Sequence, residues 1–423
     1  MQPPESSLRL GRVGPAQATQ ILLRHAPGCV TTPGLHSSGL DLLLGRLDGL
    51  PLALTQAGSY LHQTSMMLVE YVECYDSTWK DLMDEQQAHL GEEYAERSVR
   101  ATWTLSYQQV QKQCPSAANL LKLWAYLHHD DLWYELVASA RHFSVDTIDA
   151  TVDDGTDELE QSVAPAWLLD IGKSKLKFRA TLGVLLKYSL AEAKVATSSY
   201  SMHSVLHKWC RDKCSIDKQE DEIALVALGL VACSIPNESS EQLWDYGRRL
   251  LPHIRQAGNS APLTVFASHD ENVLGAFAKI GNLLTDHDEL TNAQEWYQRA
   301  FSGYEKALGP EHPSALQMIR SLGNSYRVQG KLDEAEKMLQ RALSGCEKAL
   351  GVEHTLMFET VNNLGLLYRD QGKLDDAEEM FRRALSGKEK ALGPEHTSTL
   401  DTVHKLGDLY REQGKLDEAE KMI

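Results

Sequence analysis

Histidine and cysteine side chains at helix-like intervals are the first candidates for chemistry in this sequence. The segment MHSVLHKWCRDKC contains His203, His207, Cys210 and Cys214. Imidazole nitrogens and thiolates are the usual zinc ligands, and a structural site arranges four of them as a tetrahedron. One helix would spread these side chains along a stripe of about 16 Å, whereas tetrahedral ligands converge from two elements. We therefore expect no metal site here.

A phosphate-binding loop is the second candidate, because the chain contains the triplet Gly172–Ser174, which reads Gly-Lys-Ser. The G-x-x-x-x-G-K-[ST] loop wraps phosphates with backbone N–H groups and adds a lysine charge. The first glycine position holds Trp167, and the residues WLLDI before the triplet are bulky or acidic. Such a segment cannot present a row of amides to an anion. We expect no cofactor in this chain and no enzymatic activity.

The composition is that of a multidomain protein that avoids polyanions. The 423 residues carry a formal net charge of −17, with 42% hydrophobic and 24% charged residues, and this length suits two to four domains. Nucleic acids and anionic membranes require an electropositive surface, and no basic stripe is present. The expected partner is a protein or peptide, not nucleic acid or a membrane.

Neither a membrane span nor a signal peptide is predicted. The longest apolar run, Ile223–Ile235, is much shorter than the roughly 20 residues that cross a bilayer. The start, MQPPESS, lacks the charged-then-apolar pattern of a signal peptide. The 7 cysteines are odd in number and irregularly spaced, which indicates reduced thiols. We expect a cytoplasmic location.

A repeat with a period of 42 residues dominates the C-terminal third. Residues Gln317–Phe358 match Glu359–Leu400 position by position, Asp401–Ile423 begins another copy, and Gly275–Leu316 is a diverged earlier one. Repeats of 20 to 50 residues are typical of stacked helical arrays. This region is therefore one solenoid.

Each unit predicts two helices. Leu322, Gly323 and Tyr326 share a face of the first helix, where the glycine permits close approach by the second helix. The first helix ends at Gly330. The second helix opens with the acidic LDEAE at the positive end of its dipole, and GPEH or GVEH ends it. Its apolar stripe comprises Leu332, Ala335, Met338, Leu339, Ala342, Cys346 and Ala349.

The spacing of small and apolar residues identifies the repeat type. Gly323 is followed by Ala335, Leu339 and Ala342, and the same intervals follow Gly281 and Gly365. This pattern resembles the tetratricopeptide repeat. The 42-residue variety with ALG-x-EH resembles the repeats of kinesin light chains. The resemblance covers Gly275–Ile423.

Stacked units of this kind line a concave groove with their first helices, and such a groove takes peptides. Candidates for the groove are side chains of the first helix that lie off the core positions and differ between copies. They form three columns: Arg320, Asn362 and His404; Asn324, Leu366 and Asp408; Arg327, Arg369 and Arg411. The alternative is that these side chains are simply solvated. Oligomerisation through the repeats also remains open.

The N-terminal region resembles part of a nucleotide-driven switch. The phrase DGLPLALTQAGSYL, Asp48–Leu61, is similar to the first helical subdomain that follows the nucleotide fold in NB-ARC signalling ATPases. Segments Arg97–Val110 and Ala117–Val137 resemble the winged-helix subdomain of fungal members. There Leu182–Lys213 would supply a helix, a short hairpin and a Met-His segment.

The resemblance implies two nucleotide contacts. The proline of GLPL packs on adenine and the histidine of a Met-His-Asp motif contacts the diphosphate of ADP, which correspond here to Pro51 and His203. Ser204 occupies the position of the aspartate. The alternatives are a proline that bends a helical hairpin and a histidine that caps a helix or fills the core. Neither residue could hold a nucleotide alone.

Both ends of the sequence are expected to be truncated. The phosphate loop and magnesium-binding strand of the resembled proteins would precede Met1, so ADP or ATP could bind only with that missing part. Either the gene model was cut short or a degenerate copy lost its motor. LDEAEKMI stops where the preceding copy continues.

We predict a mainly α-helical chain in which a helical subdomain and a winged-helix domain precede an α-solenoid. The expected boundaries are 1–96 for the helical subdomain, 97–214 for the winged helix, 215–265 for a degenerate helical linker and 266–423 for the repeats. The expected function is protein recognition within a fungal NB-ARC signalling or scaffold protein. The alternatives are a cargo adaptor like kinesin light chain and a residual ADP-binding module.

Overall fold

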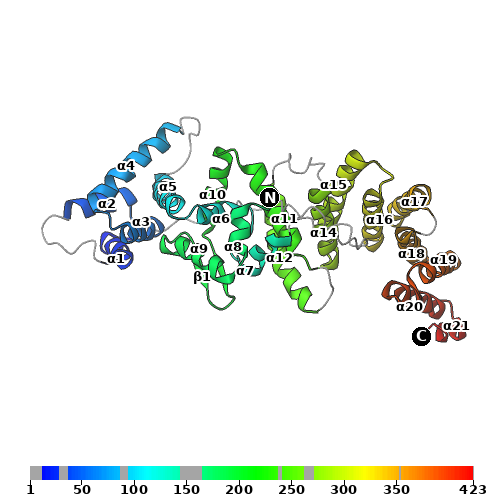
Figure 1. Ribbon diagram of the computed structural model, residues 1–423. Helices are drawn as coiled ribbons and strands as arrows, with labels where there is room; N and C mark the ends of the chain where they lie inside the picture. The colour runs from blue at the N-terminus through cyan, green and yellow to red at the C-terminus, as the bar shows by residue number, and fades with distance from the viewer. Residues whose placement is uncertain are drawn as a thin grey trace, which may run out of the picture. The chain divides into compact units, whose positions relative to one another are not determined.

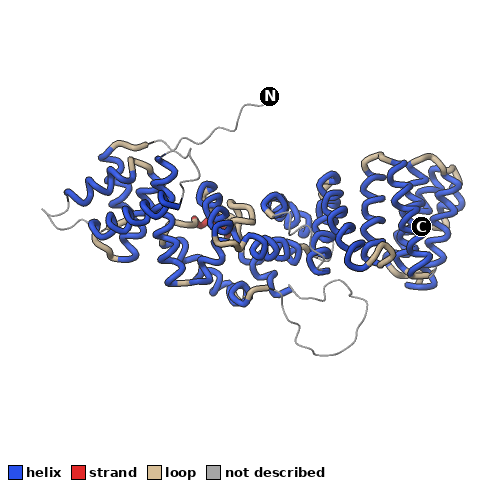
Figure 2. Tube along the Cα trace, turned by 90° about the horizontal axis from the view of Figure 1, so that it is seen from above, coloured by secondary structure: helices blue, strands red, loops and turns tan. Residues whose placement is uncertain are grey.

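The described part of the chain is mainly α-helical, as predicted (Figure 2). This computed structural model describes residues 12–27, 37–85, 94–142, 164–236, 241–261, 271–351 and 354–422. Among the described helices, none combines the length and the apolar character needed to span a bilayer. The described residues divide into two compact units, with the division at Leu230 and Val231.

The first unit is a set of helices around an aromatic core. Its elements are α1 (Pro15–His25), α2 (Ser37–Leu47), α3 (Pro51–Thr64), α4 (Leu68–Glu85), α5 (Tyr94–Gln113), α6 (Pro115–Trp124), α7 (Tyr134–Ala138), α8 (Ala166–Gly172), α9 (Lys175–Lys187), β1 (Glu192–Lys194), β2 (Ser199–Ser201) and α10 (Ser204–Ile216). Trp103, Trp124 and Trp133 are fully buried. Burial of such large rings supplies much of the hydrophobic stabilisation of a unit.

Proline marks several helix starts in this unit. α1, α3 and α6 each have a proline at the first position, where its fixed φ suits the helix and its missing N–H costs no hydrogen bond. Before α3 the chain turns at Gly49, which has φ of +66°. The Gly49 carbonyl accepts a hydrogen bond from the Val13 N–H at 2.9 Å, and a side chain on Gly49 would collide with Val13. The turn therefore requires glycine.

The hairpin expected between Leu182 and Lys213 is present. Strands β1 and β2 are antiparallel, with Glu192 opposite Ser201, and they connect α9 to α10. Leu132 pairs with Tyr200 as an additional bridge on the other side of β2. The hairpin is thereby tied to the segment between α6 and α7.

Helix α11 (Glu220–Ser234) crosses the division between the units. The predicted boundary at 214 and 215 falls in the last turn of α10. The remaining helices are α12 (Glu241–Ser260), α14 (Glu271–Asp286), α15 (Leu290–Leu308), α16 (Pro313–Val328), α17 (Leu332–Ala349), α18 (Thr355–Asp370), α19 (Leu374–Leu392), α20 (Thr397–Glu412) and α21 (Leu416–Glu420). From α14 onward they follow one another as antiparallel pairs, one pair for each repeat (Figure 1).

The glycine of each first helix meets a large side chain of its own second helix. A Cβ atom on Gly323 would lie 2.8 Å from Leu339 Cγ, and one on Gly365 would lie 2.8 Å from Phe381 Cδ1. Gly281 stands in the same relation to Tyr297. Because a Cβ contact under 3 Å is prohibitive, only glycine lets the two helices approach this closely. The expected close approach is confirmed.

The apolar stripe of the second helix differs from the prediction at its end. Ala335, Leu339, Ala342 and Cys346 are fully buried in α17, whereas Ala349 is exposed. Ala349 is the last residue of the helix. The packed stripe therefore stops one turn earlier than its sequence period suggests.

Histidine caps the first helix of three successive repeats. The Nδ1 atoms of His312, His354 and His396 accept hydrogen bonds from the backbone N–H groups of Ser314, Leu356 and Ser398, at 3.3, 3.1 and 3.1 Å. An N-cap acceptor satisfies one of the free N–H groups at a helix start. The recurring Glu-His dipeptide thus has a structural role that the sequence interpretation missed.

Candidate functional site

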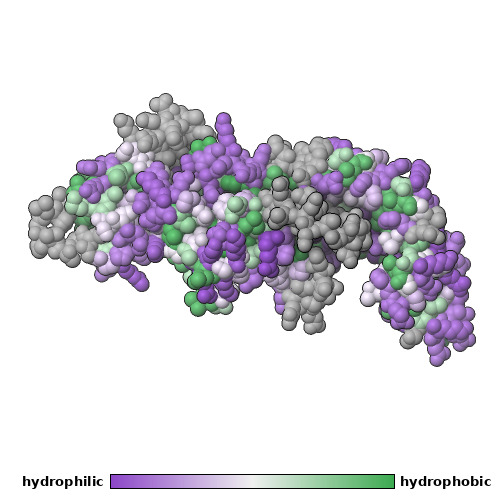
Figure 3. Space-filling model, viewed as in Figure 1, coloured by the Kyte–Doolittle hydropathy of each residue, from purple (hydrophilic) through white to green (hydrophobic). Residues whose placement is uncertain are grey.

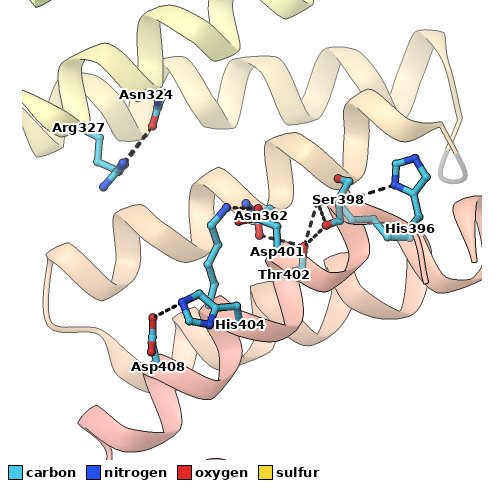
Figure 4. Close-up of polar contacts among 11 residues, drawn as sticks. Asn324, Arg327, Asn362, His396, Ser398, Asp401, Thr402, His404 and Asp408 are labelled. Atoms are coloured by element: carbon cyan, nitrogen blue, oxygen red, sulfur yellow. Dashed lines mark hydrogen bonds and ion pairs between the residues drawn. The ribbon is translucent and has the colours of Figure 1, made fainter. Parts of the chain in front are cut away.

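The three predicted columns lie on the first helices of successive repeats. Figure 4 labels Asn324, Arg327, Asn362, His404 and Asp408 among them. Each of these helices contributes one residue to each column: Arg320, Asn324 and Arg327 on α16; Asn362, Leu366 and Arg369 on α18; His404, Asp408 and Arg411 on α20. Whether they can meet a ligand depends on their own contacts.

The charged residues on α16 are paired with α18. Arg320 forms an ion pair with Glu359 at 3.1 Å, and Arg327 forms one with Asp370. The guanidinium of Arg327 also donates to Asn324 Oδ1 at 3.2 Å (Figure 4). The two arginines therefore hold neighbouring first helices together. A ligand would have to compete with these contacts.

Asn362 differs most from the prediction that it faces a ligand. It is only 4% exposed, and its Oδ1 accepts a hydrogen bond from Thr402 Oγ1 at 3.4 Å (Figure 4). Lys388 of α19 is buried beside it and donates to Thr402 Oγ1 at 3.0 Å and to the Ser398 carbonyl at 3.2 Å. Burial lowers the pKa of this lysine. Asn362 belongs to the interface between α18 and α20.

The column residues on α20 are paired along their own helix. His404 Nε2 lies 3.5 Å from Asp408 Oδ2, and Arg411 lies 3.0 Å from the other oxygen of Asp408. On α18, Arg369 lies 3.7 Å from Asp370, which also pairs with Arg327. The charges of the predicted columns are thus compensated within the array. On the face seen in Figure 3, the last repeats are largely hydrophilic.

The first helices also border a cavity that sequence reasoning missed. It has a volume of about 380 Å³ and lies along α14 and α16. Its walls combine apolar side chains with polar ones, among them Lys279, Leu283, Asp286, Gln317 and Met318, and Ile235 and Pro236 close one side. This volume lies within the range of roughly 300 to 1,000 Å³ that is typical of ligand clefts.

The cavity exists because one repeat has small residues where the others have long ones. Gly275 occupies the position of Gln317, and Ala278 occupies the position of Arg320. Extending the predicted columns back by one period would have reached Ala278 and Asn282, both of which line the cavity. The columns were begun at α16, so this signal was overlooked.

The two predicted nucleotide contacts have structural roles in this chain. Pro51 is the first residue of α3. His203 is the N-cap of α10, and its Nδ1 accepts a hydrogen bond from the Val205 N–H at 3.3 Å. Burial lowers the pKa of His203, which favours this neutral acceptor. Within the described residues, no hydrogen bond or ion pair joins Pro51 to His203.

The histidine and cysteine cluster is a helix-packing site. His207 is 4% exposed, and its Nε2 lies 2.8 Å from the Leu127 carbonyl and 3.1 Å from that of Trp124. Burial lowers the pKa of His207 to about 4 and raises that of Cys214 to about 12. Within the described residues, no group of three or more His, Cys, Asp and Glu side chains could hold a metal ion.

The Gly-Lys-Ser triplet is a helix junction. Gly172 ends α8, and its carbonyl accepts a hydrogen bond from the Tyr134 hydroxyl at 3.1 Å. Ser174 caps α9 by accepting from the Lys177 N–H at 3.2 Å. The two residues therefore join helices, and their backbone is engaged in packing and capping.

Comparison with known proteins identifies the repeats. Residues 273–348, 314–390 and 356–423 match the tetratricopeptide repeat family. None of the curated proteins compared with the sequence is a match.

Similar solved structures include proteins from three organisms. BtubC (BKLC) from P. vanneervenii is 18% identical, with a TM-score of 0.38 over 51% of this chain and 83% of that one. A putative kinesin light chain from Podospora anserina with nearly identical TPR-like repeats is 21% identical, with a TM-score of 0.32 over 50% and 87%.

The third is a signal transduction ATPase with numerous domains (STAND) and a tetratricopeptide repeat sensor, from Pyrococcus horikoshii. It is 14% identical, with a TM-score of 0.39 over 97% of this chain and 54% of that one. The helix pairs and the glycine contacts of the structure agree with the family match. Residues 273–423 of this chain consist of tetratricopeptide repeats.

Proposed function

We propose that this protein recognises an extended segment of a partner protein with the first helices of its tetratricopeptide array. The observation that carries the proposal is the cavity along α14 and α16, which combines apolar walls with polar groups. Repeat arrays bind in this way because their first helices form one continuous surface.

We further propose that the array is the sensor of a fungal NB-ARC signalling or scaffold protein in the cytoplasm. The GLPLAL phrase begins α3, and a helix, a hairpin and a second helix follow one another as α9, β1, β2 and α10. That order supports a winged-helix assignment for this part of the first unit. In this proposal the chain has no enzymatic activity, and ADP or ATP binds only together with an upstream nucleotide fold.

Selection from a random dodecapeptide display library against the 423-residue protein tests the recognition. The bound peptides are then located by hydrogen exchange. We expect protection of α14, α16, α18 or α20, with little change on the second helices. Protection confined to residues before Leu230, or no selected peptide at all, would contradict the proposal.

Nucleotide assays test the second part. We expect ATP hydrolysis at background and an unchanged melting temperature with ADP, because no amide cradle or lysine for the phosphates is present in the sequence. A rise in melting temperature with ADP that disappears in the His203→Ala variant would favour the residual ADP-binding module instead.

A further inference from the structure

Two charged residues of the cavity are unpaired, in contrast with the predicted columns. Lys279 and Asp286 project from α14 and line the cavity, and neither takes part in an ion pair or a side-chain hydrogen bond with any described residue. Burial raises the pKa of Asp286, and only the neighbouring His287 opposes this. Asp286 is exposed and Lys279 is half-buried, so both charges remain available to pair with a ligand. On the first helices, a ligand with charged side chains can therefore form new ion pairs in the cavity without displacing existing ones.

The form of the cavity suits an extended chain. Its lining runs along α14 from Gly275 to Asp286, a length of about 16 Å at 1.5 Å per residue. An extended peptide rises about 3.3 Å per residue, so about five residues fit. Alternate side chains of an extended peptide point the same way. The first, third and fifth would face the cavity.

We propose that the cavity binds a five-residue extended segment of a partner protein that carries an acidic side chain, an apolar side chain and a basic side chain at alternate positions. The acidic group pairs with Lys279 and the basic group with Asp286, while the apolar side chain packs between Leu283 and Met318. This rests on the proposed function, since it names the partner segment for the same array.

Ligands of other chemistry fit less well. A purely anionic ligand would leave Asp286 uncompensated, and a purely apolar one would bury both charges without partners, which is costly. A segment with both signs compensates Lys279 and Asp286, which are seven residues apart on α14 and so about 10 Å apart along its axis. Charge complementarity of this kind selects the partner more than it adds affinity.

Four peptides test the charge pairing. The parent probe is Ac-Glu-Ser-Leu-Ser-Lys-NH2, and the others replace Glu, Lys or both by Gln. Binding to the full chain is measured by isothermal titration. We expect Asp286→Asn to weaken binding of the Lys-bearing peptides at least fivefold and to leave the Lys-to-Gln peptides unchanged. Lys279→Gln should act in the same way on the peptides that carry Glu. Such cycles isolate the pairwise interaction.

Filling the cavity tests its location. Ala278→Arg introduces the residue that the next repeat carries at this position, and we expect at least tenfold weaker binding of the parent peptide. Gly275→Gln, also taken from the next repeat, is a second variant in case the first does not fold. Lys337→Ala, an exposed change on the second helix α17 and outside the cavity lining, is the control and should leave binding unchanged.

The outcomes separate this inference from the proposed function. Library peptides could bind the array with an affinity that falls on substitution of Arg320, Arg327 or Arg369 but does not change in Ala278→Arg. That result would overturn the inference and leave the proposed function standing. Equal weakening of all four peptides by Asp286→Asn would also overturn it. If no peptide protects the first helices, the proposed function itself fails.

Discussion

The repeats and the first unit bury their helices in different ways. In the repeats one contact recurs, a glycine against a large side chain, at Gly281, Gly323 and Gly365. The first unit relies on contacts that occur once. Lys122, 7% exposed, donates to Asp217 Oδ2 at 2.7 Å, and the buried His207 lies against two backbone carbonyls.

This difference predicts which changes destabilise each unit. A recurring close contact makes the array sensitive to side-chain volume, since every copy depends on the same missing Cβ. Buried polar groups whose contacts occur only once make the first unit sensitive to protonation, since a change of charge disrupts the hydrogen bonds that hold them. Three predictions follow this contrast, in order of expected effect.

Overpacking the recurring contact should have the largest effect. Gly365→Leu places a branched side chain against the fully buried Phe381, and we expect a loss of about 3 kcal/mol or more in the free energy of unfolding of the array. Glu379→Ala, an exposed change on the paired helix α19, should stay within about 0.5 kcal/mol. Chemical denaturation measures both, and equal midpoints would contradict the helix pairing.

Acid should destabilise the first unit through His207. Its pKa falls from 6.5 to about 4 on folding because the ring is buried, so the unfolded chain binds more protons between these values. The contribution of the neutral His207 to the free energy of unfolding is therefore fully present above pH 6.5 and is lost as the pH falls towards 4. The loss is about 2 kcal/mol at pH 5 and about 3 kcal/mol in full.

The variant His207→Gln tests this source of the pH dependence. Its amide can still donate to the same carbonyls but does not titrate. Hydrogen exchange in α6 and α10 at pH 7 and pH 5 should show a smaller pH effect in the variant than in the native chain. His62→Gln, an exposed change on α3, should keep the native dependence. An unchanged dependence in His207→Gln would refute the assignment.

Removing a buried charge from the repeats should have the smallest effect. Lys388 occupies the position of Cys346 and Tyr304 in the two preceding repeats, and only neutral oxygens accept its hydrogen bonds. Lys388→Met keeps the volume without the charge, and we expect a gain of about 1 kcal/mol at pH 7.

The pH dependence checks the cause of that gain. Burial lowers the pKa of Lys388 below the usual 10.5, so the native chain should gain stability as the pH rises towards 10.5, and the gap to the variant should narrow. Lys390→Met, an exposed change on the same helix, should leave the free energy of unfolding unchanged at pH 7 and at a pH near 10.5. Destabilisation by Lys388→Met would mean that the ammonium is adequately compensated.

Periodicity explains how much of the fold could be predicted. The helix ends at Gly330 and the contacts of Gly323 followed from a pattern that repeats several times. The capping role of His354 could not be predicted, because histidine is an uncommon N-cap and its Nδ1 must be aimed by the preceding turn. Ala349 shows that a stripe in sequence need not be packed to its end.

The candidate site was less predictable than the fold. Placing Arg320, Arg327 and Asn362 on the first helices required only the repeat period. Their partners depend on the offset between neighbouring helices, which brings Arg320 to Glu359 and Arg327 to Asp370. The period alone does not reveal that offset. The cavity likewise depends on which side chains are missing from one copy.

The pairing between neighbouring second helices has a consequence for the length of the array. Arg341 binds Glu305 at 2.9 Å, and Arg383 binds Glu347 at 2.7 Å, with the same spacing in sequence. The second helix α17 thus carries an arginine that pairs with the preceding repeat and a glutamate that pairs with the following one. Loss of residues 317–358 would bring Arg383 opposite Glu305 and restore an equivalent junction. Recombination between copies can therefore lengthen or shorten the solenoid by whole units while keeping this ion pair between neighbouring second helices.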